Sequence, residues 1–112
     1  VSTKKQTSEL VQETEEAKIA RIEAKHGKIA MVISFDQGAH VGYLKMPDRV
    51  LKDKVLAAVK DAPHHAAEIM INNILIKEES SSIFLTDDGY LLGAFQLAQE
   101  LISIKQGEIK KN

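Results

Sequence analysis

The sequence predicts an α+β fold: an N-terminal helix, a two-stranded antiparallel β-hairpin, and then three helices, with a long C-terminal helix. Three observations support this prediction. Residues 28–35 form a short apolar run, and a second, shorter run at 41–46 follows a glycine-containing turn of hairpin length. Residues 9–25 contain no glycine or proline and are rich in Glu, Lys and Ala, which favours a helix. Beyond residue 47, apolar residues recur at helical spacing.

The first predicted helix, Glu9 to Lys25, has only a weak apolar pattern, divided between two edges. His26-Gly27 ends this helix, because glycine suits the position that follows a helix. We therefore divide the chain into an N-terminal helical arm, residues 1–26, and a compact α+β domain, residues 27–112. Such an arm is either a solvated helix, a lightly packed one, or one that contacts a partner.

The first predicted strand is mostly apolar on both faces, although a half-exposed strand is more polar on one side. Its alternating faces consist of Ile29, Met31, Ile33 and Phe35 on one side and Ala30, Val32 and Ser34 on the other. The second strand contains Tyr43 and Gly42. A glycine there either weakens the strand or allows another backbone to approach closely.

Sequence signals also mark where the later helices begin. Asp48 can cap the helix that follows the hairpin, and Asp61 is a candidate cap for the next helix, in which Pro63 is tolerated in the first turn. Residues 77–85 are predicted to form a loop. The last helix is then expected to begin at Thr86-Asp87-Asp88, where the two Asp residues cap it and the helix dipole favours negative charge, and to run to about Lys110.

Two adjacent apolar stripes on the last helix are together wider than a surface helix needs. One of them consists of Leu91, Phe95, Ala98, Ile102 and Ile109. We take this width as one sign of contact with another chain. An isolated two-stranded sheet is only marginally stable, and its edges invite pairing, which is a second sign.

Asn72-Asn73 interrupts an otherwise apolar helix. Helical spacing places Asn73 between Ile69 and Met70, toward the predicted core, and a buried amide must be hydrogen-bonded. We interpret the pair as structural, tying the helix to a loop or to the hairpin, and the alternative is that it specifies an oligomer contact. The structural or interface candidates are Ile29, Met31, Tyr43, Asn72, Asn73 and Phe95.

The residues predict no catalytic, cofactor-binding or metal site. His64 and Glu68 share a helix face, but two ligands do not make a zinc site. Ser80 to Ser82 lack the surroundings of a nucleophile elbow, and no glycine-rich nucleotide loop occurs. Cysteine is absent, which excludes disulfides and thiol catalysis. We therefore expect a protein that is not an enzyme and binds no cofactor.

The length, charge and apolar content of the chain limit the kinds of partner that it is expected to bind. With 112 residues, one domain is the default. The formal net charge of -1 provides no basic excess to neutralise phosphates, so no nucleic-acid binding is expected. No apolar run approaches the ~20 residues of a membrane span, so no membrane contact is expected either. No small-molecule substrate is evident from the sequence.

Two stretches of the chain resemble small tailed-phage proteins of the tail-assembly-chaperone type. They are Val41-Gly42-Tyr43-Leu44-Lys45-Met46-Pro47-Asp48-Arg49 and Ala66-Ala67-Glu68-Ile69-Met70-Ile71-Asn72-Asn73, preceded by His26-Gly27. The order of these segments over about residues 20 to 100 carries the resemblance. The Trp and Gly-Gly that usually follow Asn-Asn are replaced here by residues 74–79.

The resemblance implies a bacteriophage or prophage protein of the virion or of tail assembly, structural or chaperone in role, with no catalytic residues. Its partners would be itself, as a homo-oligomer, or other phage structural proteins. It would be located in the virion, or in the host cytoplasm during assembly. A cellular protein-interaction or adaptor module is the alternative, and a small enzyme or ligand-binding protein is the third class.

We expect the contacts to involve the N-terminal helix and the outer face of the hairpin or of the last helix. The alternative is intramolecular: the four helices sandwich the hairpin and cover it within one chain.

Overall fold

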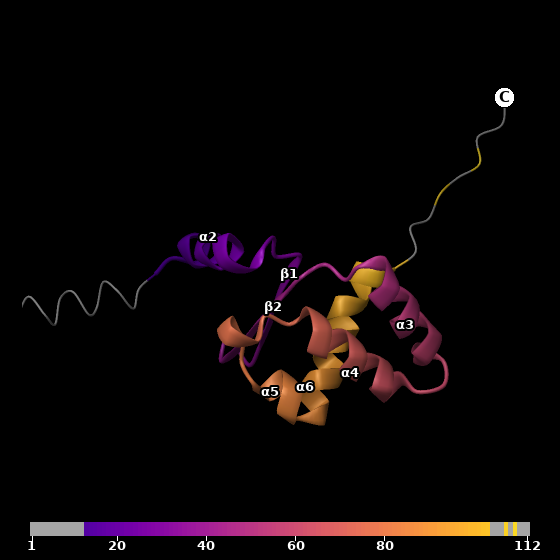
Figure 1. Cartoon of the computed structure of the whole chain (residues 1–112). Helices are drawn as coiled ribbons and strands as arrows, with labels where there is room; N and C mark the ends of the chain where they lie inside the picture. Colours follow the sequence, from indigo (N-terminus) through magenta and orange to yellow (C-terminus); the bar gives the residue numbers. More distant parts are fainter. Residues whose placement is uncertain (1–12, 104–106, 108, 110–112) are drawn as a thin grey trace, which may run out of the picture.

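The computed structural model describes residues 13–103, 107 and 109, and it confirms the α+β class and the order of helix, hairpin and helices (Figure 1). The elements are α2 (Glu15–His26), β1 (Met31–Phe35), β2 (His40–Leu44), α3 (Arg49–Val59), α4 (Pro63–Ile74), the 3₁₀ helix η1 (Lys77–Glu79), α5 (Ile83–Thr86), α6 (Asp88–Ala98) and the 3₁₀ helix η2 (Gln99–Ile102).

Helix α2 begins later than the sequence predicts. The side chain of Thr14 caps it by accepting a hydrogen bond from the backbone N–H of Ala17 at 3.0 Å. Glu13 and Thr14 are therefore outside the helix, and residues 9–12 of the predicted helix lie outside the described residues. The predicted end is confirmed within one residue, because Gly27, at φ 94°, donates its N–H to the carbonyl of Glu23.

The hairpin pairs β1 with β2 in antiparallel register, with Met31 opposite Leu44 and Phe35 opposite His40. Both strands are shorter than the sequence predicts, since β1 begins at Met31 rather than at residue 28 and β2 ends at Leu44 rather than at residue 46. Asp36, Gln37 and Gly38 all adopt positive φ in the connecting turn. The turn therefore uses the left-handed region at three successive residues, which favours Gly and tolerates Asp.

The two faces of the hairpin pack against different helices, as Figure 1 shows, with α2 on one side and α4, α5 and α6 on the other. Ile33 and Leu44 belong to the main core with these last three helices. Tyr43 belongs to a second, smaller cluster with Ile22 of α2 and with Ile76, which follows α4. The hairpin is thus sandwiched between helices of its own chain.

Gly42 lies where the hairpin meets α5. A Cβ atom at this position would be 3.0 Å from Cγ1 of Ile33 and 3.1 Å from Cε2 of Phe84, which is fully buried. Side chains rather than another backbone approach this glycine, and its small size lets the strand pack against the aromatic ring.

Helix capping follows the sequence at two of three sites. Asp48 accepts a hydrogen bond from the N–H of Leu51 at 2.8 Å, and Asp87 caps α6 by accepting from the N–H of Tyr90. The prediction that Asp61 caps α4 is wrong, because Ala62 holds the cap position without a side-chain hydrogen bond. Pro63 then occupies the first turn as expected.

The segment predicted as a loop at 77–85 instead contains η1 and the start of α5, which buries Phe84 completely. Helix α6 is shorter than predicted, because it gives way to η2 and Ser103 is not helical. Phe95 lies in the core, but Ile109 is not helical and is 89% exposed, so the prediction that it continues the apolar stripe of the last helix is wrong. Most of the remaining C-terminal residues lie outside the described part.

The predicted burial of Asn73 is also wrong. Asn72 and Asn73 are both exposed on α4. The Nδ2 of Asn73 donates to the carbonyl of Ile69 at 2.7 Å, and that of Asn72 donates to the carbonyl of Glu68 at 2.8 Å. Each amide bonds to the backbone one helical turn earlier, so neither needs a loop or the hairpin as partner. The inward face of α4 consists of Ala66, Ala67, Met70, Ile71 and Ile74.

Candidate functional site

His64 of α4 lies near two carboxylates on the surface. Nε2 of His64 lies 3.2 Å from Oδ1 of Asp88, and its Nδ1 lies 3.8 Å from Oε1 of Glu68. These side chains are all about half exposed or more. Within the described residues there is no group of three or more His, Cys, Asp or Glu that could hold a metal ion. The arrangement is a surface contact between the starts of α4 and α6.

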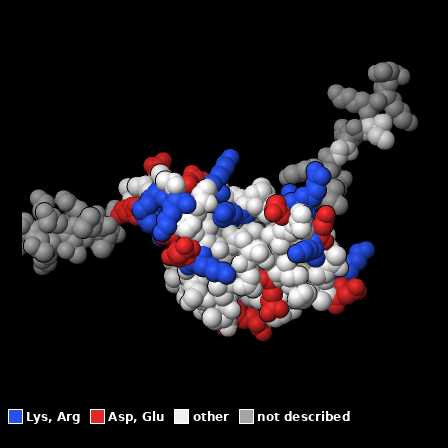
Figure 2. Space-filling model, viewed as in Figure 1, with Lys and Arg blue, Asp and Glu red and all other residues white. Residues whose placement is uncertain are grey.

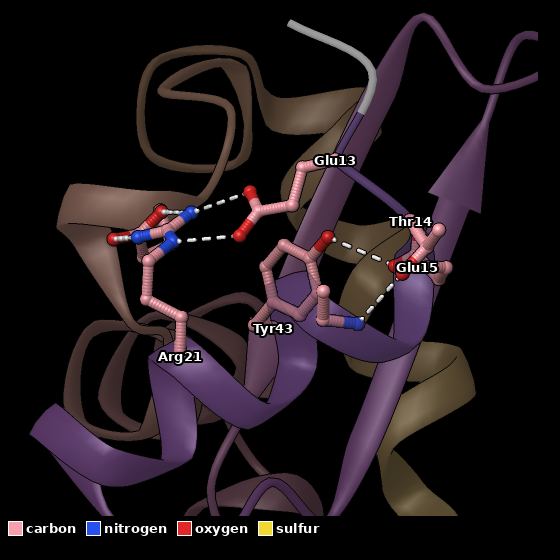
Figure 3. A network of polar contacts seen from close by, with 7 residues as sticks. Glu13, Thr14, Glu15, Arg21 and Tyr43 are labelled. Carbon is pink, nitrogen blue, oxygen red and sulfur yellow. Dashed lines mark hydrogen bonds and ion pairs between the residues drawn. The ribbon is translucent and has the colours of Figure 1, made fainter. Parts of the chain in front are cut away.

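A polar network holds α2 to the rest of the chain (Figure 3). The guanidinium of Arg21 donates to Glu13 at 3.1 Å and to Glu79 of η1 at 3.0 Å. These hydrogen bonds, first from Glu13 and then from Glu79, raise the pKa of Arg21, and the guanidinium in turn lowers the pKa of Glu79. The network joins residues far apart in the sequence and holds α2 in place. We call Arg21, Glu13 and Glu79 the polar clasp.

Tyr43 lies beneath this network and is only 1% exposed. Its hydroxyl donates to Glu15 at 3.1 Å, and the ammonium of Lys18 lies 5.2 Å from the centre of its ring. Burial, aided by the bond to Glu15, raises the pKa of Tyr43 above its ordinary value. Tyr43 is therefore neutral at physiological pH and anchors α2 to β2.

The outer edge of β2 is covered by the chain that follows α4. Ile76 donates its N–H to the carbonyl of Tyr43 at 2.8 Å, and the N–H of Tyr43 donates to the hydroxyl of Ser80 at 2.9 Å. Ser81 donates to the carbonyl of Val41 at 2.9 Å. Leu75 forms an antiparallel bridge with Leu44. The N–H and C=O of Tyr43 and the C=O of Val41 on this edge are thus satisfied within the chain.

The outer edge of β1 is open. Val32 is paired with Tyr43, and Ser34 with Val41. Because Tyr43 and Val41 use their backbone groups on the far side of β2, these are non-hydrogen-bonded pairs, and the N–H and C=O groups of Val32 and Ser34 point away from the sheet. No hydrogen bond to these groups is formed by any residue in the described ranges.

Hollows lie on both sides of this edge. The one toward α6 has a volume of about 370 Å³ and is lined by Met31, Val32, Ile33, Ser34, Gln96, Leu97 and Glu100. The one toward α2 has about 400 Å³ and is lined by Glu15, Ile19, Val32, Ser34, Gly38 and Val41. Val32 and Ser34 line both hollows, so the strand stands as a ridge with space on either side. We call Met31–Phe35 and these two hollows the β1 edge.

The β1 edge lacks two of the features that usually prevent strands from pairing with other chains, namely charged side chains and proline. Residues 29–35 contain no charged side chain and no proline. Val32 is 41% exposed at the centre of the strand, and Leu97 is 47% exposed in the wall of the hollow toward α6. Apolar surface thus adjoins unsatisfied backbone groups, a combination that suits the addition of another extended strand.

The interface candidates predicted from the sequence lie in different parts of the structure. Met31 lines the β1 edge, whereas Ile29 packs with the cluster around Tyr43 on the α2 side. Phe95 is 5% exposed and packs in the main core, and the two asparagines lie on the surface of α4.

Val32 and Ser34, the central residues of the edge, were not singled out from the sequence. Their signal was the absence of charge between Lys28 and Asp36, which is visible in the sequence but gains meaning only when β2 is known to be covered. Among the described helices, none has the length and apolar character needed to cross a membrane. Comparison of the chain with protein-family models, with curated proteins and with solved structures gave no match.

Proposed function

We propose that this protein is non-enzymatic and acts through protein–protein contacts, as a structural or assembly protein of a tailed bacteriophage. The β1 edge is the observation that carries the first part. The outward N–H and C=O groups of Val32 and Ser34 are unsatisfied by the described residues, while three of the outward groups of the neighbouring strand, on Val41 and Tyr43, are hydrogen-bonded within the chain. A strand in this state gains main-chain hydrogen bonds when another protein adds a strand to it.

The resemblance of residues 41–49 and 66–73 to tail-assembly-chaperone proteins supports the second part. In the structure the first segment is hydrogen-bonded to the residue that follows the second, since Lys45 donates its N–H to the carbonyl of Ile74 at 2.9 Å. In this setting the protein acts in the virion, or in the host cytoplasm while the particle is assembled. Its partners are further copies of itself or other phage structural proteins.

The charge distribution fits protein partners better than nucleic acid. On the face shown in Figure 2, basic and acidic side chains of the described residues are interspersed over α2 and α3. Binding to a phosphate backbone requires a stripe or patch of basic residues. The proposal therefore assigns no nucleic acid, membrane or small-molecule substrate to this protein.

Co-purification with the products of neighbouring genes tests the proposal. The tagged chain is co-expressed with each neighbouring gene product, first as wild type and then as Val32→Lys, which places a charge at the centre of the β1 edge. Leu56→Lys is the matched control, because Leu56 is 43% exposed on α3, close to the 41% of Val32. We expect a tail or virion protein to bind the wild type and Leu56→Lys, and to bind Val32→Lys weakly.

Two outcomes would contradict the proposal. Equal binding by Val32→Lys would show that the β1 edge is not the contact. Neighbouring genes of host function, together with binding only to a host protein, would instead favour the cellular adaptor.

A further inference from the structure

We infer that the partner at the β1 edge is a second copy of this chain, which pairs its own β1 antiparallel to the first. This inference rests on the proposed function and names the partner for the same surface. The resulting assembly is a two-fold dimer in which the sheet runs continuously in the order β2, β1, second β1, second β2.

The charges at the two ends of β1 favour this occupant and this direction. Residues 29–35 are uncharged, and the stretch is flanked by Lys28 on one side and Asp36 on the other. Antiparallel pairing of two copies brings the basic end of each strand to the acidic end of the other. Parallel pairing would place like charges together, which is unfavourable. The strand is therefore complementary to itself in one direction only.

The outward-pointing backbone groups define the register. When the two-fold axis passes beside Ile33, Val32 of each copy pairs with Ser34 of the other, so the open N–H and C=O groups of both residues are hydrogen-bonded. An axis at Val32 would instead pair Ser34 with Ala30, whose N–H already donates to the carbonyl of Leu44 at 2.8 Å. The open backbone groups therefore select the register centred on Ile33, in which Lys28 of each copy lies near Asp36 of the other.

The side chains fit the same arrangement. Val32, which is 41% exposed in one chain, packs beside Ser34 of the second copy, close to the dimer axis. The two-fold axis is perpendicular to the sheet, so Met31 and Ile33 of the second copy lie on the side of α6. They cover the hollow of about 370 Å³ in which Leu97 is exposed.

Sedimentation equilibrium of the full chain over a wide concentration range measures the dimer. We expect a reversible dimer for the wild type and for Leu56→Lys. Val32→Lys, which places two positive charges near each other beside the dimer axis, is expected to raise the dimer Kd about tenfold or more. Ser34→Pro removes an outward N–H without removing a hydrogen bond to β2, and it should have the same effect. Circular dichroism and thermal melting identify any variant that fails to fold.

Charge substitutions test the antiparallel direction of pairing. Lys28→Glu places an acidic side chain near Asp36 of the second copy and should weaken the dimer several-fold at low ionic strength. Adding Asp36→Asn removes the repulsion and should restore most of the affinity. Asparagine is chosen because Asp36 has φ 56°, a conformation that asparagine tolerates.

Cross-linking tests the geometry directly. The chain contains no cysteine, so Val32→Cys and Leu56→Cys each introduce a single thiol. A short bis-maleimide should join two chains through position 32 in high yield and through position 56 in low yield, because only position 32 lies close to the axis.

A wild type that stays monomeric at the highest concentration would overturn the inference, as would a dimer that survives both Val32→Lys and Ser34→Pro. A monomer that still binds a virion protein through Val32 would overturn the dimer but leave the proposed function intact. A dimer with the expected mutational pattern that binds no virion protein would support the inference and count against the proposed assembly role.

Discussion

Replacement of Ile22 by alanine should release α2 from the hairpin without unfolding the rest of the chain. Ile22 is fully buried and is the one residue of α2 that is. It packs against Tyr43 and Ile76 in a cluster separate from the main core. The attachment of the helix thus depends on a small apolar contact together with the polar clasp.

The free energy lost in Ile22→Ala follows from the burial of the isoleucine side chain. Ile22→Ala removes three carbons from a site with no exposed surface, which costs about 2–5 kcal/mol once the cavity is included. The remaining apolar contacts of α2 in this cluster come from Ile19, which is only partly buried. The ion pairs of the exposed Arg21 are screened by water and offset little of the loss. The loss is therefore comparable to the whole docking free energy of the helix.

Two measurements report the release. Amide hydrogen exchange should lose protection in residues 15–26 by on the order of 10²-fold, while α4 retains its wild-type protection. Absorbance titration of tyrosinate in a Tyr90→Phe background follows Tyr43 alone, since the chain has two tyrosines and no tryptophan. The raised pKa of Tyr43 should fall toward its ordinary value as burial and the bond to Glu15 are lost.

Lys25→Ala, an exposed change in the last turn of the same helix, is the control and should leave both readouts unchanged. Unchanged protection of α2 and an unchanged Tyr43 titration in Ile22→Ala would refute the reasoning, because the polar clasp would then suffice to hold the helix. Parallel loss of protection in α2 and α4 would refute it differently, by showing that the two clusters unfold as one unit.

Four further changes have expected outcomes. Gly42→Ala should destabilise the chain to urea by about 1–3 kcal/mol, because its methyl group would press against Phe84 and its neighbours. Asn73→Leu should change stability by no more than about 0.5 kcal/mol in thermal melting, because the side chain is exposed and bonds only within its helix. Asp48→Ala should lower stability to urea by about 0.5–2 kcal/mol through loss of the α3 cap. Melting temperature should fall above about pH 10, because the folded-state pKa of Tyr43 exceeds its unfolded value.

The direction in which pH changes the stability follows from the raised pKa of Tyr43. The contribution of Tyr43 is fully present below its unfolded pKa and is lost as the pH rises through its folded pKa, so Tyr43→Phe should flatten the alkaline decline. Tyr90, whose pKa is raised by its bond to Asp36, contributes in the same direction.

Gly107→Ala is the control for Gly42→Ala and should leave stability unchanged, because nothing lies within 4 Å of the added carbon. A stable Gly42→Ala, or an Asn73→Leu that loses more than about 1 kcal/mol, would contradict the packing described.

Local signals in the sequence were sufficient where the interaction itself is local. The caps at Asp48 and Asp87 bond to N–H groups three residues away, so residue type and position predict them. The end of α2 at Gly27 depends on a conformation that glycine adopts easily. Asn73 shows the limit of the same approach, since helical spacing gives a direction but not whether a neighbouring element covers that side.

The sequence by itself determined the α+β class, the order of the elements and the apolar character of both hairpin faces, because these follow from periodicity, capping and turn residues within short windows. Only the tertiary structure decided that α2 covers one of those faces, that residues 75–81 cover the edge of β2, and that the edge of β1 is left open. These contacts join residues roughly 20 to 60 positions apart, and their partners are chosen by shape and by backbone hydrogen bonds, which no local pattern encodes.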